Sequence, residues 1–363
     1  MTDFIPPAKP LIGDEEVAAV ERVLRSGMLA QGTEVADFER EFAETFELGR
    51  GCVAVNSGTS GLHLGLLAAG VGPGDEVVVP SFTFAATANA VALTGATPVF
   101  ADIDPATFCL DPASAEAAIT DRTKGVLPVH LYGHPAAMPA FAALAERRGV
   151  QVFEDAAQAH GATLGGRPVG TWGRFGMFSL YPTKNMTSGE GGMVACADAD
   201  TVRTVQLLRN QGMLQQYHNE LVGLNNRMTN IHAAIGRVQL TKVLAWNERR
   251  RENAAFLSAN LAGVRTPAVA EGAVHVFHQY TVRVPDDRDG FAAALKSEYA
   301  IGSGAFYPVP VHRLAPFASA DADLPQTDAA AAQCLSLPVH PSVGPAELER
   351  IVTAVNALAR AGG

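Results

Sequence analysis

Cysteines, charged residues and long apolar runs are all scarce in this chain, and each shortage excludes a class of protein. The four cysteines lie far apart and form no Cys-x-x-Cys pair, so they imply neither a disulfide framework nor a zinc site. No stretch reaches the ~18 apolar residues that span a membrane, and the N-terminal segment lacks the basic and apolar regions of a signal peptide. We therefore expect a cytoplasmic protein that has buried free thiols and no metal site.

The charge balance is acidic. Only 18% of the 363 residues are charged and the net charge is −10, which argues for a folded chain and against a nucleic-acid partner. A small anionic ligand stays possible, because a local cluster can oppose the overall sign. The 48% hydrophobic content allows a sizeable core. The length predicts two domains, or one large domain with an appendage.

Short apolar runs alternate with helical patterns from residue 14 to residue 155. The first helix, residues 14–26, has an apolar face and a glycine stop, formed by Val17, Val20, Val23, Leu24 and Gly27. Further helices are predicted at residues 60–69, 84–94, 113–119 and 137–148, and strands at residues 52–55, 76–79, 97–103, 125–130 and 150–154. This alternation predicts a mostly parallel sheet that is covered on both faces.

The pattern changes after about residue 175. Residues 175–180 and 193–196 are two strands close together in sequence, which predicts an antiparallel element. A long helical stretch at residues 231–261 is followed by a strand at 275–284, a helix near Phe291 and a last helix at residues 345–360. We place a domain boundary near residue 250.

Lys184 stands in an unusual setting for a lysine. It follows an apolar strand and a proline turn, and a glycine-rich segment, Gly189-Glu190-Gly191-Gly192, comes shortly after it. Burial in such a loop would lower the pKa of the amine and favour the neutral form, which a Schiff-base lysine requires. The alternative is an ordinary loop lysine whose ammonium lies in water.

Two strand ends offer groups for opposite charges. Thr59 and Ser60 open a helix directly after a strand, where hydroxyls and free N–H groups favour an anion such as phosphate; the alternative is a common Ser/Thr helix cap. Asp155 follows a buried strand, where open α/β sheets bind ligands, and its carboxylate is suited to hold a pyridinium proton. The alternative is a carboxylate that caps the next turn. Gln158 either lines the same site or is a polar group of the core.

Phe84 and Arg227 are weaker candidates. Phe84 follows a strand end and is able to stack on a flat cofactor ring, although core packing explains most isolated phenylalanines. Arg227 lies in a polar run before a helix and is able to bind a carboxylate or phosphate with both guanidinium nitrogens. The alternative is a surface arginine near a helix cap.

Taken together, these segments resemble the DegT/DnrJ/EryC1/StrS family of sugar aminotransferases that depend on pyridoxal 5′-phosphate (PLP). The matching segments occur in order along nearly the whole chain and form a highly specific set: Ser26-Gly27, Asn56-Ser57-Gly58-Thr59-Ser60, Phe82-Thr83-Phe84, Glu154-Asp155-Ala156-Ala157-Gln158, Phe178-Ser179, Lys184-Asn185, Gly189-Glu190-Gly191-Gly192, Asn225-x-Arg227-Met228, Tyr307-Pro308 and His312.

The resemblance implies an α/β fold of PLP fold type I, which is like that of aspartate aminotransferase. Residues 1–250 would form a large domain, with a mostly parallel mixed sheet flanked by helices, and residues 251–363 a smaller C-terminal α+β domain.

The resemblance also implies roles for individual residues. Lys184 resembles the lysine that forms the internal aldimine, and Asp155 the partner of the pyridine nitrogen. Gln158 is similar to the glutamine beside the phenolic oxygen, and Phe84 to the aromatic residue stacked on the ring.

Other matching positions imply contacts to the phosphate and the substrate. The positions that resemble phosphate ligands are Thr59, Ser60, Ser179 and Asn225. Asn225 resembles the asparagine that reaches across from a neighbouring subunit, so a homodimer with shared active sites is implied. The candidates for substrate contacts are Arg227, Tyr307 and His312.

The resemblance implies transfer of the amino group of L-glutamate to a keto-sugar linked to a nucleoside diphosphate, at C3 or C4, by a ping-pong mechanism. A sugar dehydratase of the same family would carry His in place of Lys184. A keto-inositol aminotransferase shares the same chemistry. A non-catalytic regulatory protein would not need Asp155, Gln158 and Lys184 together.

Overall fold

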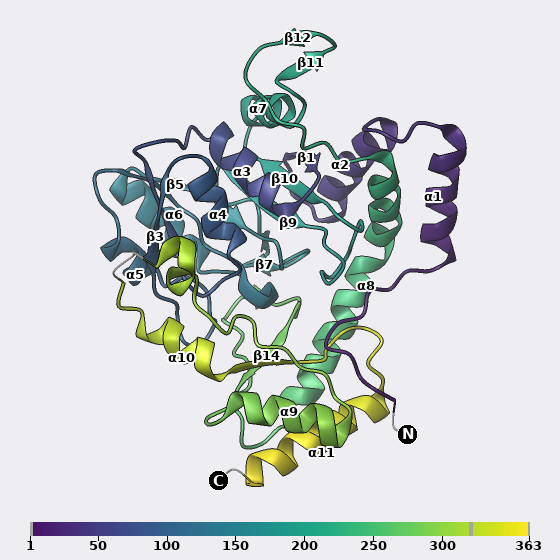
Figure 1. The fold of residues 1–363 in the computed structure, drawn as a ribbon, viewed down its shortest axis with the longest axis vertical. Coiled ribbons are helices and arrows are strands. Elements are labelled where there is room, and N and C mark those ends of the chain that lie inside the picture. Colours follow the sequence, from purple (N-terminus) through teal and green to yellow (C-terminus); the bar gives the residue numbers. More distant parts are fainter. Residues whose placement is uncertain (1–2, 319–321, 362–363) are drawn as a thin grey trace.

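A mixed sheet flanked by helices forms the centre of the computed structural model, which describes residues 3–318 and 322–361 (Figure 1). One half of the sheet is parallel, in the order β3 (Thr97–Ala101), β2 (Glu76–Pro80), β4 (Thr123–Val126) and β5 (Gln151–Val152). The other half has the order β6 (Glu154–Asp155), β9 (Phe175–Ser179), β10 (Gly192–Cys196) and β1 (Gly51–Val55).

The two halves join where β6 continues from β5. The backbone N–H of Asp155 donates to the oxygen of Pro128, and the N–H of His130 donates to the oxygen of Asp155, each at 3.0 Å. Strand β10 runs antiparallel to both β9 and β1, whereas β6 and β9 are parallel. The predicted mostly parallel sheet with one antiparallel element is therefore confirmed. The strand predicted at 150–154 is interrupted between β5 and β6.

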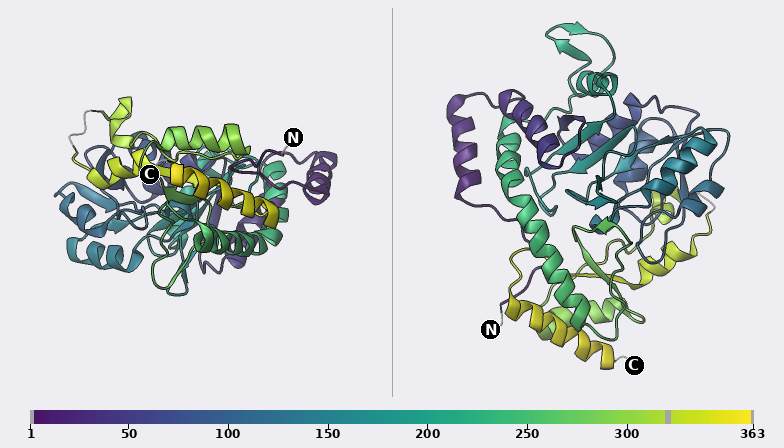
Figure 2. Two further views of the ribbon diagram at one scale, coloured as in Figure 1. Left: turned by 90° about the horizontal axis from the view of Figure 1, so that it is seen from below. Right: turned by 180° about the vertical axis from the view of Figure 1, so that it is seen from behind.

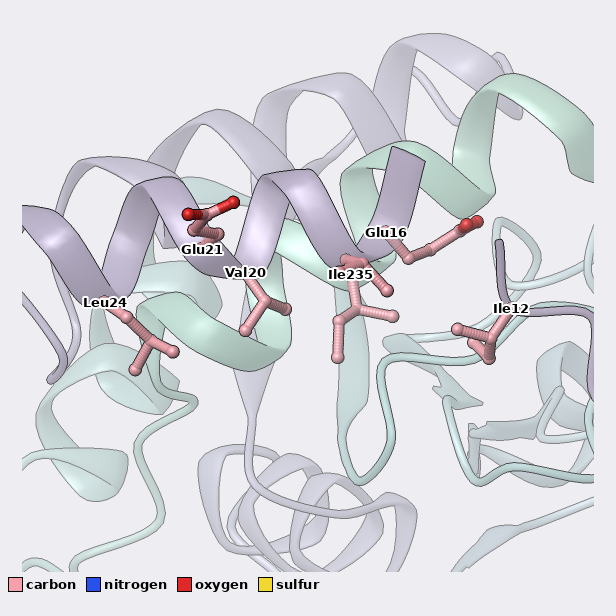
Figure 3. Close-up of a pocket in the computed structure, with 7 residues that line it drawn as sticks. Ile12, Glu16, Val20, Glu21, Leu24 and Ile235 are labelled. Atoms are coloured by element: carbon pink, nitrogen blue, oxygen red, sulfur yellow. The ribbon is translucent and has the colours of Figure 1, made fainter. Parts of the chain in front are cut away.

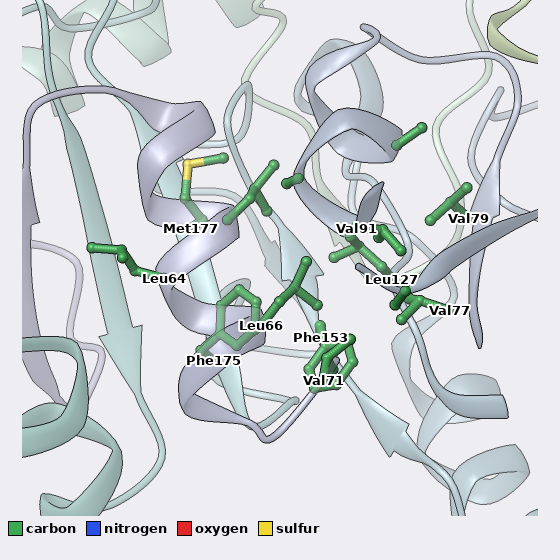
Figure 4. Close-up of a cluster of buried hydrophobic side chains, with 14 of the residues drawn as sticks. Leu64, Leu66, Val71, Val77, Val79, Val91, Leu127, Phe153, Phe175 and Met177 are labelled. Carbon is green, nitrogen blue, oxygen red and sulfur yellow. The ribbon is translucent and has the colours of Figure 1, made fainter. Parts of the chain in front are cut away.

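Successive side chains of each strand point to opposite faces of the sheet, and helices cover both faces. Val53 and Val55 of β1 belong to a core cluster that includes residues of α3 (Gly58–Ala68), α4 (Ala86–Leu93) and α7 (Ala199–Arg209) (Figure 4). Cys52 and Ala54 belong to a second cluster, with residues of α2 (Thr33–Thr45) and α8 (Asn230–Asn260). Each fully buried Val, Leu or Phe side chain contributes about 1.5–3 kcal/mol.

Two glycines let α3 approach the sheet closely. A Cβ atom at Gly61 would lie 2.8 Å from Cγ of Met177, and one at Gly65 would lie 2.6 Å from Cε2 of Phe175. Both contacts are far shorter than a normal separation between carbon atoms. The glycines therefore fix the distance between α3 and β9, and with it the place where α3 begins beside Ser179.

The C-terminal part is an antiparallel pair covered by helices. Strands β14 (Tyr280–Arg283) and β15 (Cys334–Leu337) pair with each other, and α9 (Arg288–Tyr299) and α11 (Pro345–Ala361) lie together at one end of the molecule (Figure 2). Ala254 and Leu257 of α8 belong to the same core cluster. The predicted domain boundary near residue 250 falls inside α8, one continuous helix, and stays a prediction.

The strand predicted at residues 275–284 is wrong over its first half. Residues 275–279 are irregular, because their backbone groups bind a distant loop instead of a strand. The N–H of Val276 donates to the oxygen of Gly133 at 3.1 Å, and the N–H of Gln279 donates to the oxygen of Tyr132 at 3.2 Å. These bonds tie the C-terminal part to the sheet domain.

Helix α1 (Asp14–Ser26) ends at Gly27 as predicted, but the expected apolar face is only partly its buried face. Val17 is 60% exposed and Leu24 is 54% exposed, whereas Ala19 and Val23 pack against α8. Glu16 is buried as well, and its carboxylate accepts hydrogen bonds from the side chains of Gln239 and Lys242 of α8. The periodicity of apolar residues identified the helix but gave no sign that Glu16 is buried against α8.

The remaining elements surround the sheet. Those predicted from the sequence within about two residues are α5 (Pro112–Ala117) and α6 (Met138–Arg148). Those with no counterpart in the sequence reading are α2, α7, α10 (Pro325–Gln333), and the short strands β7 (Thr163–Leu164), β8 (Arg167–Pro168), β11 (Met213–Gln215), β12 (His218–Asn219) and β13 (Ala273–Val274). The β11–β12 hairpin projects from the end of the molecule opposite α11 (Figures 1 and 2).

Candidate active site

A cavity of about 550 Å³ lies at the carboxyl ends of β6 and β9, between the sheet and the C-terminal part. Ligands of open α/β sheets bind at such an edge. The predicted site residues that line this cavity are Thr59, Phe84, Asp155, Gln158, Ser179, Lys184 and Tyr307. Tertiary structure thus brings together residues that are far apart in sequence.

Lys184 lines the cavity, in a turn that follows β9. Its backbone N–H donates to the oxygen of Tyr181 at 3.0 Å, and the hydroxyl of Thr187 closes the loop on the oxygen of Leu180 at 2.9 Å. Burial lowers the pKa of Lys184 to about 8, against the attraction of the Asp155 charge, which raises it. A useful fraction of neutral amine is therefore present near neutral pH, as a nucleophilic lysine requires.

Asp155 ends β6 and is buried. Its Oδ2 atom accepts a hydrogen bond of 2.8 Å from the hydroxyl of Thr87, and its Oδ1 atom accepts one of 3.1 Å from the N–H of Ala157. Burial raises the pKa of Asp155, whereas these two donors and the charge of Lys184 lower it. The carboxylate faces the cavity and is suited to pair with a cationic ring nitrogen.

The first turn of α3 forms the opposite side of the cavity. Ser57 is the N-cap: its Oγ atom accepts a hydrogen bond from the N–H of Ser60 at 3.1 Å, and its hydroxyl donates one to Oγ of Ser60 at 2.9 Å. A Cβ atom at Gly58 would lie 3.0 Å from Cβ of Ser179, so only glycine lets the helix start beside that hydroxyl. Hydroxyls and helix N–H groups converge here on a place for an anion.

Gln158 joins two tyrosines at the rim. Its Oε1 atom accepts from the N–H of Tyr132 at 2.7 Å, and its Nε2 atom donates to the hydroxyl of Tyr307 at 3.2 Å. Burial raises the pKa of Tyr307, so its hydroxyl stays protonated. The ring of Phe84 lies 5.8 Å from that of Tyr307 and is 57% exposed, so Phe84 is a wall of the cavity and not a core residue.

Four predicted residues are not among those that line the cavity: Ser60, Asn225, Arg227 and His312. Arg227 donates to Oδ1 of Asn210 at 2.6 Å, and Asn225 is exposed beside it. His312 is buried, with Nδ1 2.6 Å from the hydroxyl of Ser81. Their roles stay predictions.

Several lining residues were not identified from the sequence as site residues: Pro7, Ala8, Thr83, Tyr132, Glu190, His278 and Gln279. Thr87, which binds Asp155, was missed too. Thr83 and Glu190 belong to segments that carry the family resemblance, whereas the others leave no pattern in the sequence.

A second hollow, of about 400 Å³, is a groove between α1 and α8 (Figure 3). Ile12, Val17, Val20, Leu24 and Ile235 line it, together with Glu16 and Glu21. The groove has no lysine, histidine, serine or cysteine among its lining residues. We therefore distinguish this apolar groove, called the α1 groove below, from the chemical site.

Comparison with known proteins agrees with this geometry. The profile of the DegT/DnrJ/EryC1/StrS aminotransferase family matches residues 10–356. The chain is 41% identical over 346 residues to the UDP-N-acetyl-3-dehydro-alpha-D-glucosamine 3-aminotransferase of Acidithiobacillus ferrooxidans. This match covers 94% of the chain and 93% of the relative. The chain is also 40% identical over 347 residues to a pleiotropic regulatory protein of Geobacillus stearothermophilus, which covers 93% and 92%.

A solved structure is similar over almost the whole chain. DesV of Streptomyces venezuelae, in complex with a ketimine intermediate, has a TM-score of 0.91 and 42% sequence identity, and the match covers 95% of this chain and 94% of that chain. The predicted α/β fold is thereby confirmed.

Proposed function

Because the chain belongs to the DegT/DnrJ/EryC1/StrS aminotransferase family, we propose that it transfers the amino group of L-glutamate to a keto-sugar linked to a nucleoside diphosphate, with PLP as its cofactor. The observation that carries this proposal is the position of Lys184 and Asp155. Both line one cavity, the amine has its pKa lowered by burial, and the carboxylate is held by two donors.

The residues of the cavity fit PLP. The phosphate would lie at the first turn of α3, with Thr59 and Ser179 as ligands and Gly58 leaving the space that a side chain would fill. The buried carboxylate of Asp155 would pair with the ring nitrogen, and Phe84 would cover the ring face. When bound, PLP supplies an electron sink for the carbanion at the reacting carbon.

Each residue then has a defined task. Lys184 would move a proton between the substrate carbon and the cofactor, because its amine lines the cavity and is partly neutral. Asp155 keeps the ring nitrogen protonated. Gln158 would lie beside the phenolic oxygen of bound PLP, and its hydrogen bond to Tyr307 orients the amide. Ser60 supports the phosphate site through Ser57.

A nucleotide-linked sugar is the proposed amino acceptor. The name of the Acidithiobacillus relative describes a 3-keto sugar carried by UDP, which favours amination at C3 over C4. Tyr307 lies at the rim of the cavity, where a sugar would enter, and we propose it as a substrate contact. Arg227 and His312 are not among the residues that line the cavity, and we propose them as further substrate contacts.

We also propose a homodimer with shared active sites, in the cytoplasm. Asn225 is exposed and lies outside the cavity of its own chain, as a residue that serves the neighbouring site would. The α1 groove is lined mainly by apolar side chains, Met28 and Leu29 just after α1 are exposed as well, and exposed apolar surface of this kind often marks a protein interface. A second copy of the chain is therefore the proposed occupant of the α1 groove.

The regulatory relative keeps one alternative open. A regulatory protein on this fold would bind PLP or a sugar without catalysing a reaction. The presence of Asp155, Gln158 and Lys184 around one cavity favours the enzyme, because binding alone does not require a nucleophilic amine. A keto-inositol aminotransferase would use the same residues and differs only in its acceptor.

The test uses the purified protein loaded with PLP. We expect a yellow protein whose visible band shifts on addition of L-glutamate, with release of about one 2-oxoglutarate per site in the absence of acceptor, as a ping-pong mechanism requires. A panel of keto-sugar nucleotides and keto-inositols, read by mass spectrometry, identifies the acceptor. A band that ignores every amino donor would favour the regulatory alternative and sink the proposal.

A further inference from the structure

The hydroxyls of Thr83 and Thr87 form a chain that ends on Asp155. The Oγ1 atoms of the two threonines are 3.2 Å apart, and the hydroxyl of Thr87 donates to Oδ2 of Asp155 at 2.8 Å. All three side chains are buried. Neither the helix nor the sheet requires these two side-chain hydrogen bonds, because the backbone hydrogen bonds of both form without them.

The donor direction follows from the chemistry of the groups. A hydroxyl has a single hydrogen, and an ionised carboxylate only accepts. Thr87 therefore donates its only hydroxyl hydrogen to Asp155, and the oxygen of Thr87 accepts the hydrogen bond that Thr83 donates. Both donors thus point toward the carboxylate, and successive hydrogen bonds polarise one another in a buried site.

Hydrogen bonds at both oxygens of the Asp155 carboxylate fix its rotation and favour its ionised form. The last torsion of an aspartate is a broad, roughly two-fold rotor, and one hydrogen bond would leave it free to swing. Here Thr87 binds Oδ2 and the N–H of Ala157 binds Oδ1. The two anchors hold the plane of the carboxylate and leave its outer lone pairs open to the cavity, which Asp155 lines.

We propose that Thr87, supported by Thr83, is a positioning residue that holds the Asp155 carboxylate ionised and in the plane required by the ring nitrogen of PLP. The inference rests on the proposed function and deepens it. The other charged or titratable groups that act on Asp155 are Lys184, His130 and Tyr307. None of them is hydrogen-bonded to the carboxylate in the described part of the chain, so the threonine contact is the one that a single substitution removes.

Thr87→Val is the main variant, because valine keeps the branched shape and lacks the hydroxyl. Without this donor the pKa of Asp155 rises and the ring nitrogen loses its proton more readily. The nitrogen that joins Lys184 to the cofactor then sits beside a less positive ring and holds its own proton to higher pH. We expect the pH midpoint of the visible band to rise by about one pH unit, and PLP to dissociate about tenfold more readily, as loss of a hydrogen bond to a charged group predicts.

Two variants separate positioning from packing. Thr87→Ser restores the hydroxyl and should bring the midpoint back to within about 0.3 pH unit of the wild type, since the same charged hydrogen bond is remade. Thr94→Val, at the C-cap of the same helix, is the matched control, because the Thr94 hydroxyl donates to the backbone oxygen of Val91 at 2.7 Å and Thr94 does not line the cavity. Its midpoint should equal that of the wild type.

A second measurement needs no cofactor. The Asp155 carboxyl is titrated by ¹³C NMR in the PLP-free protein and assigned with Asp155→Asn, and Thr87→Val should raise its pKa by about one pH unit. Equal titration of wild type, Thr87→Val and Thr94→Val in both measurements would overturn the role of Thr87 and leave the proposed function standing. A wild type that takes up no PLP would instead overturn the proposed function, and the PLP-free titration would still decide whether Thr87 acts on Asp155.

Discussion

The Nε2 atom of His130 donates a hydrogen bond of 3.1 Å to Oε2 of Glu154, and both side chains are completely buried. The direction is fixed because Nδ1 of His130 accepts from the N–H of Ala136 at 3.0 Å. Glu154 also accepts from the backbone N–H groups of Gly170, Trp172 and Gly173 at 2.7–2.8 Å. One carboxylate therefore ties three segments together directly beside Asp155.

Glu154→Gln should destabilise the protein strongly. The amide of glutamine would turn its own N–H groups toward donors and leave at least one buried backbone N–H without an acceptor, a loss of about 3 kcal/mol. Urea unfolding of the PLP-loaded protein measures the difference. Glu116→Gln, at a half-exposed carboxylate that pairs with Arg147 on the surface, is the control and should change stability by less than about 0.5 kcal/mol. Similar values for the two variants would contradict the role of Glu154 as a structural hub.

Lys184 should react as an unusually acidic lysine. Burial brings its pKa to about 8, and only the neutral amine is nucleophilic. In the PLP-free protein, the rate of acylation at Lys184 should therefore rise with pH and level off just above pH 8. Exposed Lys296 of α9 is the reference for an amine that burial does not affect, and its profile should differ from that of Lys184. Competitive labelling followed by peptide mass spectrometry gives both profiles in one sample, and coincident profiles would refute the desolvated amine.

Replacement of the same residue tests the chemistry. Lys184→Ala should lower turnover by more than about 10⁴-fold, because the variant lacks both the covalent link and the proton carrier. Lys296→Ala, the matched control, should retain wild-type turnover. Near wild-type amination by the Lys184→Ala protein would end the assignment.

Gly61→Ala should weaken both the fold and the phosphate site. The new methyl group would lie 2.8 Å from Cγ of Met177 and 3.2 Å from a methyl of Val194, so α3 must move away from β9. We expect a loss of about 1–3 kcal/mol in unfolding free energy, as overpacking predicts, together with weaker binding of PLP at the first turn of α3. Gly72→Ala is the control, since no atom lies within 4 Å of its Cβ. If both variants bound PLP like the wild type, the spacing of α3 and β9 would not set the site.

The α1 groove gives a prediction about assembly. Val17→Asp places a charge on a side chain that is 60% exposed in one chain and would be covered by a second copy. Sedimentation velocity should show the dimer shift toward monomer, because an unpaired charge is costly to bury. Val269→Asp, at an exposed valine outside the groove, should leave the dimer intact. A Val17→Asp dimer as tight as the wild type would place the interface elsewhere.

Lys184 and Asp155 illustrate what could be predicted from the sequence. Each follows an apolar strand, and the carboxyl ends of adjacent parallel strands lie at one edge of a sheet. The sheet itself was predictable because strand and helix patterns alternate along the chain. The end of α1 was predictable as well, because Gly27 readily adopts the left-handed backbone that ends a helix.

Thr87 and the residues of the rim illustrate what could not. Thr87 looks like any polar residue of a short helix until the fold places it 2.8 Å from Asp155. His278 and Gln279 reach the cavity because their backbone binds residues 132 and 133 and not a neighbouring strand. Such contacts join segments more than 60 residues apart, as Thr87 and Asp155 show, and leave no periodic signal.

The amino-acid sequence by itself determined the chemical groups and the succession of strands and helices along the chain, because these follow from residue type and local periodicity. Only the tertiary structure decided which hydroxyls and amides surround the two reactive groups, and which apolar stripe stayed on the surface. These depend on packing between distant segments, where shape and hydrogen-bond geometry select among many partners that are equivalent along the chain.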